Sequence, residues 1–208
     1  MPSLSTGADN FALFEPGQSS TLHDMRAAGS IDVPIQVSGA SARAHVLVDQ
    51  HEARRRAQFR LKAVLDPLLL DACLTIRKGA VVGWHHLSAQ HREGLRGAPA
   101  GVFTELDGRF QVDLSVPVQV NRVVVSSESW RRSLARADAL RRFAPTTIRV
   151  GQKIPDDQVW EASFLGVGVT VAGPNGDKDV ILPESRSWRL DTSRWRLAEL
   201  CWQRLLEP

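Results

Sequence analysis

The sequence predicts an α+β fold with a mostly antiparallel sheet, packed helices and β-hairpin insertions. Two hairpin signals carry this prediction. Asp107-Gly108 and Asn175-Gly176 each lie between strand-like segments, and such dipeptides favour the tight turns of hairpins. The third observation is that strand-like and helix-like segments are mixed along the chain. Together with the hairpins, this mixture favours α+β over a doubly wound parallel sheet.

The composition is that of a globular protein. The chain has 208 residues, of which 43% are hydrophobic and 24% are charged, which is enough to bury a substantial core. Residues 1–30 are rich in Ser, Gly and Pro, and we expect them to form an N-terminal arm that is mobile when alone. Residues 31–208 contain no repeat and no clear linker, so they are predicted to form a single α+β domain.

The predicted domain begins with extended segments. Residues 31–37 and 42–48 are short extended runs that we expect to pair as a hairpin around a Ser-Gly step. Residues 57–65 alternate apolar and polar side chains, which indicates a half-buried strand. The polar face of that strand would carry Arg60 and Lys62.

The later elements follow from turn residues and helical periodicity. Pro67 suits the first turn of a helix, and Gly79 suits its end. Asp156 and Asp157 are interpreted as part of a solvated turn. In chain order we expect a helix over 67–78, a hairpin over 101–114, a strand over 121–127, an amphipathic helix over 128–143, a second hairpin over 164–182 and a closing helix over 192–206.

The two cysteines and the absence of long apolar runs indicate where the protein functions. Cys73 and Cys201 lie in apolar helical patterns without a CxxC spacing, so they are predicted to be buried free thiols of a reducing compartment. The N-terminus lacks a basic segment followed by an apolar core, and no apolar run approaches the ~20 residues that span a bilayer. We therefore expect a soluble, cytoplasmic protein without a membrane partner.

Three of the six histidines lie in "GWHHLSAQH", at His85, His86 and His91. "WHHL" resembles the double-histidine motif of HNH-type toxin nucleases, which implies a small metal-dependent nuclease around His85 and His86 as one alternative. Such a nuclease needs further His or Asn partners to complete the metal coordination and activate water. No histidine follows His91, and the only later asparagines are Asn121 and Asn175. We therefore predict no metal, no cofactor and no catalytic residue.

Short motifs are spread over residues 57–155, at Leu65, Asp66, Leu68, Leu69, Ser126, Ser127, Arg141, Arg142, Phe143, Gly151 and Lys153. Together these motifs resemble those of the RAMP subunits of CRISPR effector complexes. The closest type is the small subunit of plasmid-borne type IV systems that caps the 5′ end of the guide RNA. The resemblance implies a ferredoxin-like fold and a non-catalytic RNA-binding subunit that holds the guide RNA beside the other subunits of a complex. Such proteins usually carry a glycine-rich loop near the C-terminus, whereas this chain ends in a Trp-rich helix.

Basic side chains are the candidate RNA contacts, because the arginine fork suits phosphate and phosphate contacts position the RNA backbone. "RRR" at residues 54–56 precedes the predicted strand, so we expect its side chains to cluster at one sheet edge. Trp84 is the candidate for base stacking, because the other tryptophans are expected to be mostly buried. The predicted set is Arg54, Arg55, Arg56, Arg60, Lys62, Trp84, Arg131, Arg132, Arg141, Arg142 and Lys153.

The remaining alternative is an intracellular interaction protein that binds no nucleic acid. Its abundant arginine would then reflect coding bias, and the arginines would be scattered over the folded surface. This alternative and the RNA-binding hypothesis therefore predict different distributions of positive charge.

Overall fold

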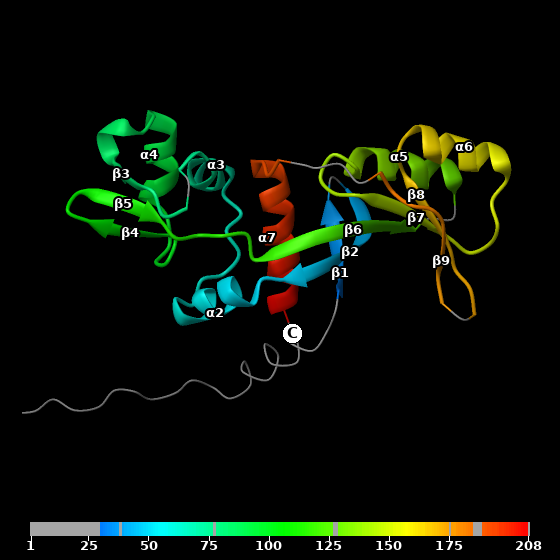
Figure 1. Ribbon diagram of the computed structural model, residues 1–208, viewed down its shortest axis with the longest axis horizontal. Helices are drawn as coiled ribbons and strands as arrows, with labels where there is room; N and C mark the ends of the chain where they lie inside the picture. Colours follow the sequence, from blue (N-terminus) through cyan, green and yellow to red (C-terminus); the bar gives the residue numbers. More distant parts are fainter. Residues whose placement is uncertain are drawn as a thin grey trace, which may run out of the picture.

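The computed structural model describes residues 30–37, 39–76, 78–126, 129–174, 176–184 and 189–207. The predicted N-terminal arm lies outside this set except for Ser30. Within the described residues, the α+β class and the mostly antiparallel pairing are confirmed (Figure 1). No helix in this part of the chain is both long enough and apolar enough to cross a membrane.

A six-stranded sheet forms the larger part of the molecule. In spatial order its strands are β1 (Ile31–Val37), β2 (Ala40–Val48), β6 (Val118–Ser126), β7 (Thr146–Val150), β8 (Gly168–Val171) and β9 (Lys178–Ile181). Neighbours pair antiparallel except β6–β7 and β7–β8, which are parallel. The predicted first hairpin is confirmed as β1–β2, and the hairpin predicted within 164–182 is confirmed as β8–β9.

Helices cover one face of this sheet. They are α5 (Trp130–Leu140), α6 (Asp156–Phe164) and α7 (Thr192–Leu206). Parallel neighbours require crossover connections, and α5 and α6 supply them. The row Val33–Ala44–Val123 crosses three strands in register and is buried in one cluster with Leu134 of α5 and Ala198 of α7.

The opposite face of the six-stranded sheet is open. Side chains alternate across a strand, so the neighbours of the buried row point away from the helices. Asp32, Gln36 and Arg43 on this face are exposed, and His45 and Arg122 are half-buried. Among the described residues, the sheet is therefore one half of a two-layer arrangement.

A smaller lobe is inserted between β2 and β6. It contains α3 (Pro67–Thr75), α4 (Ala89–Arg96) and a three-stranded sheet in the order β3 (Val81–Gly83), β5 (Arg109–Val112), β4 (Phe103–Leu106). The predicted hairpin at Asp107-Gly108 is confirmed. Both turn residues have positive φ, 51° and 70°, as a type I′ turn requires. Phe110 and Val112 are buried in a second hydrophobic cluster, to which Trp195 of α7 also belongs.

The strand predicted over residues 57–65 is wrong. The chain instead forms α2 (Gln50–Gln58), followed by an irregular segment. Asp49 starts the helix because its carboxylate accepts from the backbone N–H groups of His51 and Glu52, as an N-cap residue does. The helix ends at Gln58, two residues before Arg60, which adopts a φ of +51°.

Helices α4 and α6 were not predicted. The Ser88 hydroxyl accepts from the backbone N–H of His91 and caps α4, where the sequence suggested only a polar loop. Asp156 and Asp157, interpreted as a solvated turn, form the first turn of α6. Carboxylates stabilise that end of a helix because the helix dipole is positive there.

Candidate protein-interaction surface

Two of the three consecutive arginines, Arg55 and Arg56, are structural. Arg56 is 1% exposed and donates to both carboxylate oxygens of Glu199, at 2.8 and 2.6 Å, and to Glu52 at 2.9 Å. It also donates to the backbone carbonyl of Ser115. A guanidinium that is buried and paired in this way cannot reach a phosphate. The expectation that Arg54 to Arg56 cluster near a sheet edge is wrong, because they lie on helix α2, where Arg54 is exposed while Arg55 and Arg56 bond to Glu52.

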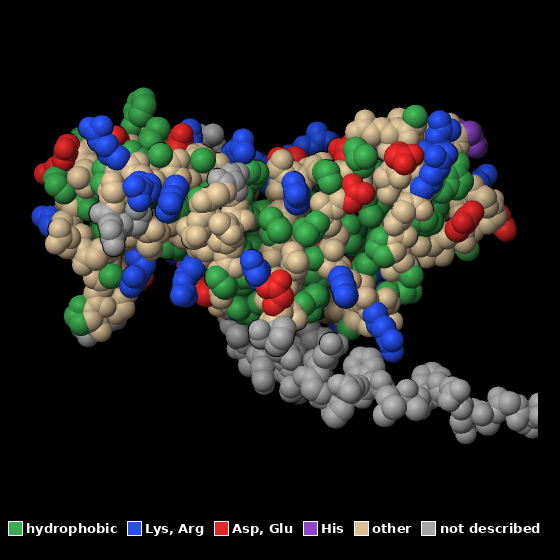
Figure 2. All heavy atoms as spheres, turned by 180° about the vertical axis from the view of Figure 1, so that it is seen from behind, with side chains coloured by type: hydrophobic (Ala, Val, Ile, Leu, Met, Phe, Trp, Pro, Cys, Tyr) green, Lys and Arg blue, Asp and Glu red, His purple; other side chains and the backbone are tan. Residues whose placement is uncertain are grey.

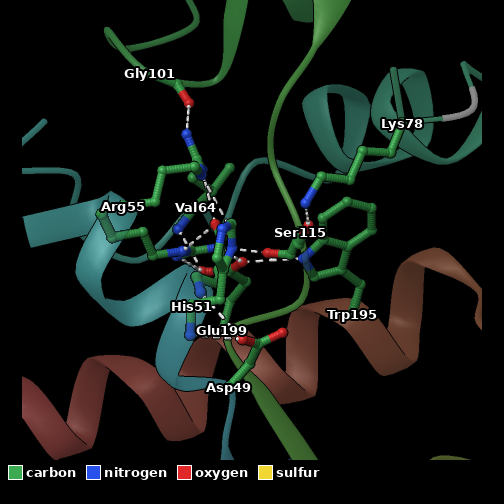
Figure 3. A network of polar contacts seen from close by, with 11 residues as sticks. Asp49, His51, Arg55, Val64, Lys78, Gly101, Ser115, Trp195 and Glu199 are labelled. Atoms are coloured by element: carbon green, nitrogen blue, oxygen red, sulfur yellow. Dashed lines mark hydrogen bonds and ion pairs between the residues drawn. The ribbon is translucent and has the colours of Figure 1, made fainter. Parts of the chain in front are cut away.

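Arg55 belongs to the same network (Figure 3). It donates to both oxygens of Glu52, at 2.8 and 2.7 Å, and to the carbonyl of Gly101. The hydrogen bond to Glu52 raises the pKa of Arg55. Burial raises the pKa of Glu52, but the hydrogen bonds from Arg55 and Arg56 outweigh it, and the net result is a pKa below the ordinary value. The Glu52 carboxylate is therefore held by hydrogen bonds from both arginines.

The other predicted RNA contacts do not form one track. Arg54, which is exposed, lies on α2, whereas Arg131 and Arg132 lie on α5, and these helices are on opposite sides of α7 (Figure 1). Arg141 is half-buried and pairs with Asp138 at 2.6 Å. Figure 2 shows Lys and Arg side chains spread over a whole face among acidic and hydrophobic ones. The remaining exposed members are Arg60, Lys62, Arg142 and Lys153.

Trp84 is not the most exposed tryptophan. It begins a short 3-10 helix, Trp84–His86, and is half-buried, with its ring centroid 5.2 Å from that of Phe110. Phe110 is a core residue of the smaller lobe. Trp84 therefore packs against its own lobe. The expectation that Trp84 is the exposed tryptophan is wrong, because Trp160 is 77% exposed.

The histidines of "GWHHLSAQH" do not converge on one point. The rings of His85 and His86 lie 3.9 Å apart. His91 instead lies 3.3 Å from a carboxylate oxygen of Asp71 and 3.5 Å from the hydroxyl of Thr75. Across the described ranges, no three His, Cys, Asp or Glu side chains come together in a way that could hold a metal ion.

The open face of the sheet carries paired charges. His45 lies 2.7 Å from Asp32, Arg122 lies 2.9 Å from Asp179, and the two charged groups Arg149 and Asp177 are 2.7 Å apart. The hydrogen bond from Arg149 lowers the pKa of Asp177. Arg122 and Arg149 on this face are therefore paired with carboxylates. The six strands contain no Phe or Trp on which a base could stack.

A pocket of about 520 Å³ lies where α7 meets the ends of β2 and β6. Its walls are largely apolar, and Arg194 is the cation among its lining residues. The guanidinium of Arg194 donates to the backbone carbonyls of Arg142 and Arg189. Its charge is therefore engaged by the protein, and we assign no ligand to this pocket.

Helix α6 presents the most exposed aromatic side chains among the described residues. Trp160 is 77% exposed and Phe164 is 90% exposed. They are four residues apart, so they share one face of the helix. Ala162, which is fully buried, lies on the other side and packs into the core beneath. The aromatic pair thus points into solvent while the helix remains anchored.

Three carboxylates lie on the same helix as this aromatic pair. Asp156, Asp157 and Glu161 are exposed, and α6 contains no Lys or Arg. The indole N–H of Trp130, at the start of α5, donates to Glu161 at 2.8 Å. The sequence does not predict this surface, because the tryptophans other than Trp84 are expected to be mostly buried. Its signal is the i, i+4 spacing of Trp160 and Phe164 after two aspartates that suit the N-terminus of a helix.

Comparison of this chain with protein-family models, with curated protein sequences and with solved structures finds no match.

Proposed function

We propose that this protein is a non-catalytic interaction module that docks a partner protein through α6. The exposure of Trp160 and Phe164 carries the proposal. Large aromatic side chains dominate the energetics of protein interfaces, and Trp is enriched among the residues whose removal costs most binding energy. Covering one such side chain stabilises an association by about 1.5–3 kcal/mol.

The fold itself does not need these two aromatics. Ala162, with Val159 half-buried beside it, provides the contact between α6 and the sheet. Trp160 and Phe164 therefore add little to folding, while they expose apolar surface that favours unwanted association. A partner that covers them accounts for their presence. The arginines in the described part of the chain fit this reading, because they are distributed over α2, α5 and the sheet.

The test compares partner capture by the parent chain and by two variants that each lose exposed apolar surface. In Trp160→Ala/Phe164→Ala the aromatic pair is removed. In the control, Leu106→Ala, a leucine that is 54% exposed on the smaller lobe is removed instead. We expect one or more proteins captured by the parent to be retained by the control and lost by the α6 variant. Identical capture by all three would overturn the proposal.

A second candidate function is RNA binding within a guide-RNA complex, as the resemblance to RAMP subunits implies. The observation that favours it is the open sheet face, which carries the exposed Arg43 and also Arg122 and Arg149. An open sheet is a common platform for single-stranded RNA. A ferredoxin-like order runs β–α–β–β–α–β, whereas this sheet begins with a β1–β2 hairpin. The open face, rather than the order of strands, supports this candidate.

RNA binding is tested by measuring affinity for single-stranded RNA at several salt concentrations. If the sheet face contacts phosphates, Arg43→Ala lowers the salt slope by about one unit for every RNA sequence alike. The matched control is Arg131→Ala on α5, which we expect to leave the slope unchanged. An absence of binding at low salt, with and without candidate partner subunits, contradicts this second function.

A further inference from the structure

We propose that the segment docking on α6 is a basic amphipathic helix, with apolar residues at helical spacing flanked by Lys or Arg. This inference rests on the proposed function and specifies its partner. It follows from the shape of the α6 surface and from the charges beside it.

The shape of the surface is a ridge. Trp160 and Phe164 lie one turn apart on a nine-residue helix, and side chains four residues apart form the ridges that interdigitate when helices pack. Because α6 packs on the core through Ala162 on its opposite side, the ridge points away from the core. Trp160 and Phe164 can fit into the grooves of a second helix. That helix needs an apolar face, with apolar residues at helical spacing such as i, i+3 and i+4.

The side chains of α6 beside the ridge carry negative charge. Asp157 and Glu161 precede Trp160 and Phe164 by three residues each, so each carboxylate is a direct neighbour of an aromatic on the helix surface. None of the ion pairs within the described residues involves a carboxylate of α6. Acidic side chains elsewhere in the fold, such as Glu52 and Asp179, are paired with arginine.

This charge selects among the possible occupants. A second copy of the chain, docked α6 against α6, would bring like charges together, which disfavours the pairing. An RNA backbone would place phosphates beside the same carboxylates. A helix flanked by Lys or Arg places opposite charges there, and it adds salt-sensitive attraction to the apolar contact.

The experiment uses the full chain and three labelled peptides of about 18 residues, long enough for a helix to form on binding. The first has a leucine face flanked by Lys and Arg. The second has the same leucine face flanked by Glu. The third has the composition of the first in an order that gives no apolar face. Affinities are measured by fluorescence anisotropy between about 50 and 200 mM salt.

We expect the basic amphipathic peptide to bind at least about tenfold more tightly than either control peptide. The variant Asp156→Asn/Asp157→Asn/Glu161→Gln keeps the size of each side chain, and the new amide at position 161 still offers an oxygen that can accept from Trp130. In this variant we expect the preference over the Glu-flanked peptide to disappear. Circular dichroism confirms that each variant remains folded.

The outcomes separate this inference from the proposed function. If both amphipathic peptides bind equally and Trp160→Ala/Phe164→Ala abolishes both, α6 is a docking site and only the basic partner is wrong. If Trp160→Ala/Phe164→Ala leaves the binding of the basic peptide unchanged, the α6 surface is not the site and both proposals are overturned. If no peptide binds the parent at low salt, the inference about the partner fails, and partner capture alone decides the function.

Discussion

Arg56 and Glu199 are 143 residues apart in the chain, yet both oxygens of the Glu199 carboxylate accept hydrogen bonds from the guanidinium of Arg56 inside the protein. Glu199 also accepts from the backbone N–H of Val64 and from the indole N–H of Trp195. These contacts join α2 and the segment after it to the C-terminal helix (Figure 3). Because α7 contributes Trp195 to one hydrophobic cluster and Trp202 to the other, the pair stabilises the junction of the two lobes.

Arg56→Ala is expected to lower the free energy of unfolding by about 3–5 kcal/mol, because Glu52 and Glu199 would lose the guanidinium that both of them share. Urea unfolding measures this change. Arg54→Ala is the matched control, since Arg54 lies on the exposed side of the same helix and should change stability by no more than about 0.5 kcal/mol. Equal stabilities of the two variants would show that the buried network contributes nothing.

The same network predicts how stability depends on acidity. Burial acts to raise the pKa of Glu52, but the hydrogen bonds from Arg55 and Arg56 outweigh it, so the pKa in the folded protein lies below the ordinary value. The stabilisation is therefore fully present above the unfolded-state pKa, about 4.3, and is lost as the pH falls through the folded-state pKa. Glu52→Gln should be less stable than the parent at neutral pH.

Urea unfolding at a series of pH values checks this prediction. The difference in stability between the parent and Glu52→Gln should narrow as the solution is acidified below the ordinary glutamate pKa. A difference that stays constant down to the lowest pH at which both fold would contradict the assignment of the linkage to Glu52.

Both cysteines are expected to resist modification in the native protein. Burial raises the pKa of Cys201 to about 12, and burial together with the negative charge of Glu199 raises that of Cys73 to about 12. The reactive thiolate is therefore scarce at pH 8, and both sulfurs are buried. Alkylation followed by mass spectrometry should modify neither residue in the native state and both in denaturant. Rapid modification of either one in the folded chain would contradict its placement.

Trp84→Ala is expected to destabilise the smaller lobe by about 1–3 kcal/mol, because the variant loses the contact between Trp84 and Phe110. The control is Val81→Ala, since Val81 is 49% exposed in the neighbouring strand β3. Thermal unfolding distinguishes the two variants. A Trp84 variant that unfolds like the parent, but binds single-stranded RNA more weakly, would restore Trp84 as a stacking residue.

Local features of the chain determined several elements by themselves. Asp107-Gly108 predicts its hairpin because a type I′ turn depends only on the conformational freedom of two residues, and the structure has both at positive φ. Helices α5 and α7 follow from apolar residues at helical spacing, and Leu134 and Trp202 are buried as that spacing requires. The buried cysteines were predicted for the same reason.

Only the tertiary structure decided what the charged and aromatic side chains do. The local pattern of "RRR" does not distinguish Arg54, which is exposed, from Arg56, whose partner Glu199 belongs to the last helix. It likewise does not show that Trp160 is left uncovered, while Trp195 is buried between segments distant in sequence. Turn geometry and periodicity act over a few residues, whereas burial and ion pairing depend on which distant segments meet. That physical difference separates the fold class, which the sequence predicts, from the exposed aromatic surface of α6, which it does not.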